Sequence, residues 1–173
     1  MSLKDVCIVR SALILMLIVM SLVAVNAQNN AVRVLTGAEL VRVVPPGFYF
    51  EGQSAPTQVR NSAAARFGEK RNVVAGIVDT SGYSTDIRAK YEGFLITDSG
   101  IEIGGQTLPT GAYGFGFTGE GKFNVFDIGG KLFLSITTAD DRRLRRPRPL
   151  MMSKSSDGLR LYSGRSYVII LLK

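Results

Sequence analysis

The chain has 173 residues, with 21 Lys and Arg, 14 Asp and Glu, one Cys, no His and no Trp, and a formal net charge of +7. Because His is absent and the one Cys stands at position 7, the sequence excludes a Cys/His metal site, a histidine base, a disulfide within the chain and, in the folded domain, a cysteine nucleophile. The length suits one domain that buries a substantial core.

The first 27 residues have the pattern of a cleavable signal peptide. Lys4 and Arg10 precede an apolar run over residues 11–25, and Val25-Asn26-Ala27 approximates the small-x-small pattern of a cleavage site. The run is shorter than the roughly 20 apolar residues that cross a bilayer. We therefore predict cleavage after Ala27 and export to the periplasm or the extracellular space, with membrane contact only before cleavage. An uncleaved N-terminal anchor is the alternative.

The predicted fold is mainly β, because all 19 glycines follow the leader and separate short apolar runs, as turns separate strands. We predict an N-terminal segment over residues 28–44 and a β-rich domain over residues 45–173. The predicted strands cover residues 32–35, 40–44, 48–50, 73–78, 94–97, 101–103, 106–108, 113–118, 123–128, 132–137, 150–154, 159–162 and 167–172. The last of these is continuously apolar, which predicts a central strand. Gly104 and Gly105 predict a two-residue hairpin turn.

Residues 54–67 suit either a short helix or one arm of a hairpin whose turn lies at 68–71. The hairpin is favoured because the β-branched run after the turn is typical of a strand. One short helix is predicted over residues 84–91, where Ser84 or Thr85 can cap the start, and acidic and basic residues lie at the ends that the helix dipole favours. The fold class is therefore an antiparallel sandwich or barrel-like domain with one short helix.

In residues 112–117, three aromatic residues alternate with small ones, so that the two kinds lie on opposite faces of a strand. We expect the aromatic face, with Tyr113, Phe115 and Phe117, to lie in the core, and the small face to admit a close approach by backbone or a ring. The alternatives are a ligand slot over the small face, or a cavity for an apolar ligand lined by the three aromatic residues.

Gly114, Gly116 and Gly119 match the G-x-G-x-x-G spacing of dinucleotide-binding loops. That site needs a helix after the glycines, whereas the residues that follow are typical of a strand. The pattern therefore indicates a hairpin, and we expect neither a cofactor nor a bound metal.

Asp79, Ser81 and Tyr83 form a candidate site loop. Residues 77–82 resemble the Asp-Thr-Gly loop of aspartic proteases, but Ser81 stands where that family has Gly, and no second copy of the loop exists. The favoured interpretation is that Asp79 ends a strand and caps a turn, with Gly82 in a left-handed conformation. A hydrolase that acts through carboxylates such as Asp79, or through Ser and Lys, is the least favoured function.

Five arginines lie within residues 142–148, which we call the arginine loop. Without them the net charge of the chain after Ala27 would fall from +6 to +1. One interpretation is an anion-binding patch for an envelope surface or a polysaccharide. The other is a solvated loop whose arginines pair with Asp140 and Asp141. Nucleic acid is not expected, because the protein is predicted to be exported and no aromatic residue lies among the arginines. The candidate binding residues are Arg142, Arg143, Arg145, Arg146 and Arg148.

The sequence resembles a group of exported bacterial β-rich proteins of unknown function. The shared elements are D-T-S-G-Y-S at residues 79–84, L-P-x-G-x-Y at 108–113, R-P-x-P-L at 146–150 and L-Y-x-G-R at 161–165. The resemblance implies export and a β-rich fold, and it transfers no catalytic residue. Our leading hypothesis is thus a non-enzymatic binding or structural domain that uses the arginine loop as its contact element.

Overall fold

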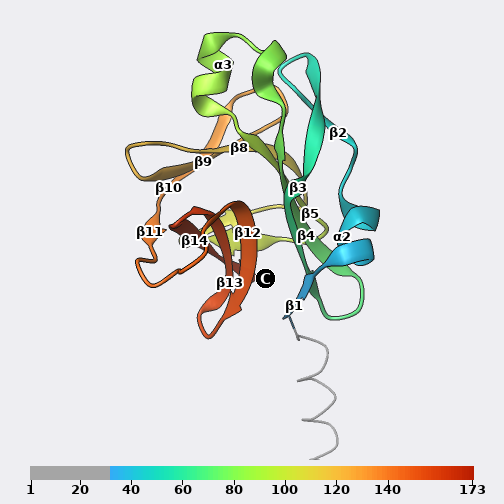
Figure 1. The fold of residues 1–173 in the computed structure, drawn as a ribbon, viewed down its shortest axis with the longest axis vertical. Helices are drawn as coiled ribbons and strands as arrows, with labels where there is room; N and C mark the ends of the chain where they lie inside the picture. Colours follow the sequence, from blue (N-terminus) through green and yellow to red (C-terminus); the bar gives the residue numbers. More distant parts are fainter. Residues whose placement is uncertain (1–31) are drawn as a thin grey trace, which may run out of the picture.

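The computed structural model describes residues 32–173, which form two antiparallel sheets (Figure 1). The predicted signal peptide and its cleavage site lie outside the described residues. The strands are β1 (Val32–Leu35), β2 (Gly47–Phe50), β3 (Gln53–Phe67), β4 (Arg71–Val78), β5 (Gly93–Thr97), β6 (Ile101–Ile103), β7 (Gln106–Leu108), β8 (Gly111–Phe117), β9 (Lys122–Phe126), β10 (Leu132–Thr137), β11 (Ala139–Asp140), β12 (Arg148–Ser155), β13 (Gly158–Gly164) and β14 (Ser166–Leu172). The helices are α2 (Gly37–Val43), α3 (Thr85–Lys90) and a 3₁₀ turn, η1 (Thr80–Gly82).

The first sheet has the order β1-β3-β4-β5-β8-β9-β10, with β2 paired to the start of β3, and the second has the order β12-β13-β14-β6-β7, with β11 paired to β14. Within residues 32–173 the strands do not close into a barrel. The mainly β fold is therefore confirmed, and β14 is the central strand that its apolar sequence predicts. The Gly104-Gly105 turn between β6 and β7 is also confirmed, with φ angles of 56° and 80°.

The main core lies between the two sheets. Phe67, Leu95 and Phe115 reach it from the first sheet, and Leu159 and Ile170 reach it from the second. All five are almost inaccessible to solvent, so burial of apolar side chains between the sheets is the principal source of stability.

A second core covers the opposite face of the first sheet. It contains Phe50, Tyr91 and Phe94, and it is closed by α2, β2 and the segment around α3. Because the first sheet is covered on both faces, consecutive residues of β4 from Val73 to Gly76 are all buried. This explains why β4 has a continuous apolar sequence rather than an alternating one.

Residues 32–173 contain two α-helices, so the expectation of one short helix in this domain is wrong. Residues 40–44, predicted as a strand, belong largely to α2, where Leu40 and Val43 pack on the second core. Glu39 lies in the first turn and Arg42 in the last, as the helix dipole favours. Glu39 also forms an ion pair with Arg33 of β1, which ties the helix to the sheet.

The predicted helix at 84–91 is confirmed as α3, and its cap is Ser84, whose Oγ accepts a hydrogen bond from the Ile87 backbone N–H at 3.4 Å. Residues 54–67 form strand β3, as the hairpin interpretation predicts. The pairing of β3 with β4 is interrupted between Thr57 and Ser62. We call residues 58–61 the β3 bulge.

Candidate functional site

The arginine loop connects β11 to β12, and Asp141 fixes its shape. The Asp141 backbone N–H donates to the Arg165 carbonyl at 3.0 Å, and the Leu144 N–H donates to the Asp141 carbonyl at 3.2 Å. Oδ1 of Asp141 accepts from the Arg143 N–H at 3.0 Å, and Oδ2 accepts from the Tyr162 hydroxyl at 3.2 Å. The carboxylate of Asp141 therefore holds the backbone of the loop on the second sheet.

The five arginines of the loop are all exposed. Arg142 lies 3.7 Å from Asp140, but its side chain is 93% exposed, and such a pair contributes little to stability. The other four have no ion-pair partner within residues 32–173. The interpretation that the arginines pair with Asp140 and Asp141 is therefore confirmed only for Arg142, which pairs with Asp140. The loop presents positive charge that the described part of the chain leaves largely uncompensated.

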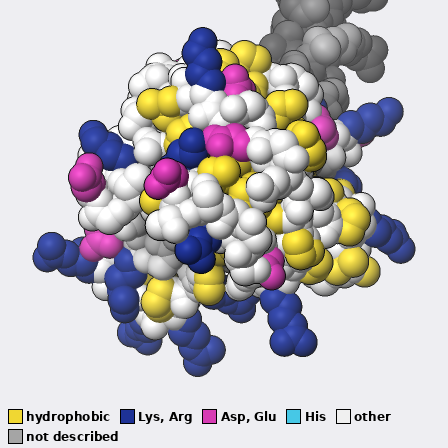
Figure 2. All heavy atoms as spheres, turned by 90° about the horizontal axis from the view of Figure 1, so that it is seen from above, with side chains coloured by type: hydrophobic (Ala, Val, Ile, Leu, Met, Phe, Trp, Pro, Cys, Tyr) yellow, Lys and Arg dark blue, Asp and Glu magenta, His cyan; other side chains and the backbone are white. Residues whose placement is uncertain are grey.

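Basic side chains are also prominent on the face of the molecule that Figure 2 shows. On the face seen in Figure 2, Lys and Arg project around the rim and crowd along one edge, with acidic side chains scattered between them. The whole chain carries a formal net charge of +7, so the arginine loop belongs to a protein with an excess of positive charge.

The Asp79 loop is a capped turn. Asp79 directly follows β4 and caps η1, and its Oδ1 accepts a hydrogen bond from the Ser81 N–H at 3.0 Å, which lowers the pKa of the carboxyl. Ser81 is exposed, whereas the hydroxyl of buried Tyr83 donates to the Gln53 carbonyl at 2.9 Å. The capping role of Asp79 is confirmed. The left-handed conformation expected for Gly82 is wrong, because Gly82 belongs to η1 and its φ is not positive.

A cleft of about 370 Å³ brings the Asp79 loop close to the end of the arginine loop. Its lining includes Asp79, Thr80, Arg88, Glu92 and Pro149, the residue that follows the last loop arginine. Ser81 and Tyr83 do not line it. The two candidate regions are thus neighbours in space, although about 70 residues separate them in the sequence.

Glu92 is a partly buried acidic residue that the sequence analysis missed. Burial raises the pKa of its carboxyl, and Oε2 accepts a hydrogen bond from the Phe117 N–H at 3.2 Å. The pKa values of Asp79 and Glu92 thus shift in opposite directions. Both carboxylates nevertheless accept hydrogen bonds from backbone N–H groups, and this structural role accounts for their positions without catalysis.

The aromatic residues of β8 belong to the core. Phe115 is inaccessible to solvent and lies against Phe123 with ring centroids 5.6 Å apart, and Phe117 lies 4.8 Å from the same ring. The Tyr113 hydroxyl donates to the Pro109 carbonyl at 3.0 Å. The expectation that the aromatic face is core is confirmed.

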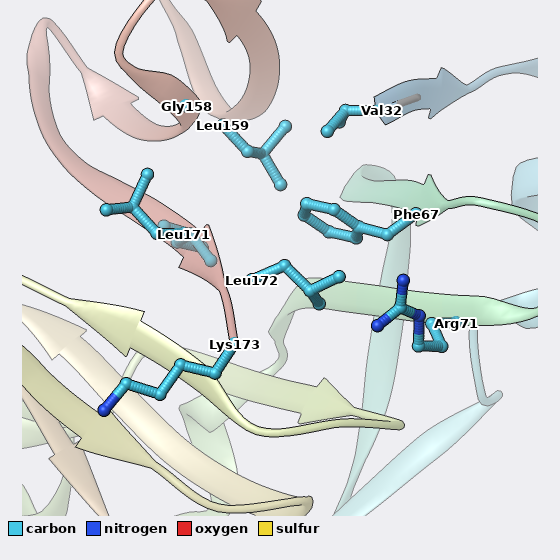
Figure 3. Close-up of a pocket in the computed structure, with 9 residues that line it drawn as sticks. Val32, Phe67, Arg71, Gly158, Leu159, Leu171, Leu172 and Lys173 are labelled. Carbon is cyan, nitrogen blue, oxygen red and sulfur yellow. The ribbon is translucent and has the colours of Figure 1, made fainter. Parts of the chain in front are cut away.

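A separate apolar groove of about 400 Å³ lies beside the C-terminal end of β14. Figure 3 shows the side chains of Val32, Phe67, Leu159 and Leu172 converging on it, with Arg71 and Lys173 at its margin. The groove joins the first and second sheets at the end of the main core.

Residues 32–173 contain no cluster of three or more acidic, His or Cys side chains that could hold a metal ion. No helix in this range is long and apolar enough to cross a membrane. Comparisons of the chain with protein families, with curated proteins and with solved structures find no match.

Proposed function

We propose that this protein is exported and non-enzymatic, and that it binds a polyanionic envelope surface or an acidic polysaccharide through the arginine loop. One observation carries the proposal. Four of the five loop arginines have no ion-pair partner within the described residues, while Asp141, the acidic residue directly before the first of them, is used to hold the loop backbone.

The chemistry of guanidinium suits repeated anions. Each group can donate two parallel hydrogen bonds to a phosphate or carboxylate, and several groups held on one loop bind a polymeric or planar array of anions together. A single exposed ion pair contributes at most about 1 kcal/mol, so binding depends on the number of arginines engaged. Such binding weakens as salt is added, because exposed charges are screened.

The test uses the chain without the predicted signal peptide, residues 28–173, with vesicles that contain an anionic phospholipid, with neutral vesicles and with polygalacturonate. One variant replaces Arg142, Arg143, Arg145 and Arg146 with Gln. The control replaces four exposed lysines, Lys70, Lys122, Lys131 and Lys154, with Gln, and so removes the same charge. We expect the loop variant to lose at least about tenfold in affinity at low salt and the control to lose much less. Equal losses would mean that net charge, and not the loop, determines binding.

Export is tested separately by N-terminal sequencing of protein recovered from outside the cytoplasm. We expect the mature chain to begin at Gln28. A chain that retains Met1 would contradict cleavage after Ala27.

A further inference from the structure

A second cleft lies on the other side of the start of β12. It has a volume of about 280 Å³ and is bounded by the β3 bulge, by β12 and by the connection from β1 to α2. Arg60 of the bulge and Arg148 at the end of the arginine loop both line it. We call it the β12 cleft. Nothing in the sequence links Arg60 to the arginine loop, because 88 residues separate Arg60 from Arg148.

Arg60 and Arg148 each lie at an irregularity in strand pairing. On β3 the register with β4 shifts between Thr57 and Ser62, and on β12 the register with β13 shifts between Arg148 and Met151. Bulges redirect side chains away from the regular alternation of a strand and are common beside binding sites. Here both irregular segments contribute an arginine to the lining of the same cleft.

The two guanidinium groups are not neutralised within residues 32–173. Neither Arg60 nor Arg148 forms an ion pair or a side-chain hydrogen bond there, and no residue that lines the cleft is acidic. Two cations on one cleft repel each other, and an anion bound between them would remove that repulsion. The charge of the cleft is therefore complementary to a phosphate or another compact anion.

The rest of the lining is largely apolar and aliphatic. Seven of its ten members are apolar side chains, namely Val34, Leu35, Leu40, Ala63, Leu150, Met151 and Met152. Methionine side chains adapt to flexible apolar ligands. The lining contains no aromatic residue on which a sugar ring could stack. This composition favours a ligand with an alkyl chain over a saccharide.

We infer that the β12 cleft binds an anionic phospholipid, with the phosphate between Arg60 and Arg148 and the first part of one acyl chain along Leu40 and Met151. The volume is at the lower limit of small-molecule pockets, about 300 Å³, which suits a head group and part of a chain rather than a whole lipid. This inference rests on the proposed function and narrows it, since it selects lipid over polysaccharide as the source of the anion.

The test measures binding of monomeric dihexanoyl phosphatidic acid to the chain without the predicted signal peptide, residues 28–173, with the methionine methyl groups labelled with ¹³C for NMR. Inorganic phosphate and dihexanoyl phosphatidylcholine serve as the head-only and the uncharged probes. We expect phosphatidic acid to shift the signals of Met151 and Met152 and to bind more tightly than either of the others. The matched variants are Arg60→Gln, in the cleft, and Arg42→Gln, exposed on α2 and outside the lining.

Arg60→Gln should weaken phosphatidic acid binding by up to about fivefold, the loss expected for one exposed ion pair, and Arg42→Gln should not change it. Unchanged binding in Arg60→Gln, or inorganic phosphate that binds as tightly as the lipid, would overturn the inference.

The variant in which Arg142, Arg143, Arg145 and Arg146 are replaced with Gln separates the two proposals, because it keeps both Arg60 and Arg148. We expect this variant to lose binding to vesicles and to keep its affinity for monomeric phosphatidic acid. If this variant binds vesicles as tightly as the native chain does, the proposed function of the arginine loop is wrong. The effect of Arg60→Gln on the binding of monomeric phosphatidic acid still decides the inference on the cleft.

Discussion

The phenyl ring of Phe50 lies directly on the backbone of Gly114, so close that a Cβ atom at position 114 would overlap the ring. Phe50 is inaccessible to solvent, and its ring stacks on Tyr91 with ring centroids 4.0 Å apart and lies edge-on to Phe126. The ring therefore has no room to move away. Gly114 on β8 thus allows β2 to close the second core.

We expect Gly114→Ala to destabilise the protein by about 1–3 kcal/mol, because overpacking a closed core forces side chains off their preferred rotamers. The measurement is urea denaturation followed by far-UV circular dichroism. Gly119→Ala, in the following turn, is the control, since a Cβ there meets nothing within 4 Å. Its effect should stay within about 0.5 kcal/mol. Equal stabilities of the two variants would show that the Phe50 ring can shift to accommodate the added Cβ atom.

The period of two residues in β8 is visible in the sequence, so the faces of this strand could be predicted. The partner of the small face could not, because Phe50 lies 64 residues before Gly114 and no local pattern joins them. The same limit applies to α2, where the apolar residues at 40, 41, 43 and 44 suit either element until the second core selects the helix.

The candidate site divides in a similar way. The arginine loop is a compositional feature and can be found by counting. The roles of Arg60 and Glu92 depend on a bulge and on burial, which arise from contacts between distant segments. Asp141 looks like a counter-ion for the loop, but the structure uses it to hold the backbone.

The two glycines of the β6–β7 turn should differ in their response to substitution. Both have positive φ, so Ala at either position is strained. A Cβ at Gly104 would in addition overlap Cγ2 of Ile136, whereas one at Gly105 meets nothing within 4 Å. We expect Gly105→Ala to cost about 1 kcal/mol from strain and Gly104→Ala to cost more. Thermal denaturation compares them, and a larger loss for Gly105→Ala would contradict the packing of Ile136 on this turn.

The ion pair of Asp157 with Arg160 should contribute to stability in a pH-dependent way. Oδ2 of Asp157 lies 2.7 Å from Nη2 of Arg160, and this hydrogen bond lowers the pKa of the carboxyl to about 2. A depressed pKa in the folded state stabilises the fold above the ordinary pKa near 3.8, and this contribution is lost as the pH falls toward 2. Asp157→Asn should therefore melt slightly below the native protein at pH 6, and the gap should close toward pH 2. A gap that does not depend on pH would indicate that the loss comes from the turn and not from the charge.

Glu92 should have the opposite pH dependence. Because burial raises its pKa, the folded state favours the protonated form, so the contribution of Glu92 to stability is complete below its ordinary pKa near 4.5 and is lost as the pH rises through the higher folded value. Glu92→Gln removes the charge and keeps an oxygen that can accept from the Phe117 N–H. We expect this variant to melt above the native protein at pH 7 and the difference to shrink toward pH 4. Glu120→Gln, exposed in the β8–β9 turn, should show no such trend. A variant that is less stable at pH 7 would mean that the ionised carboxylate is compensated in the cleft, whose lining includes Arg88.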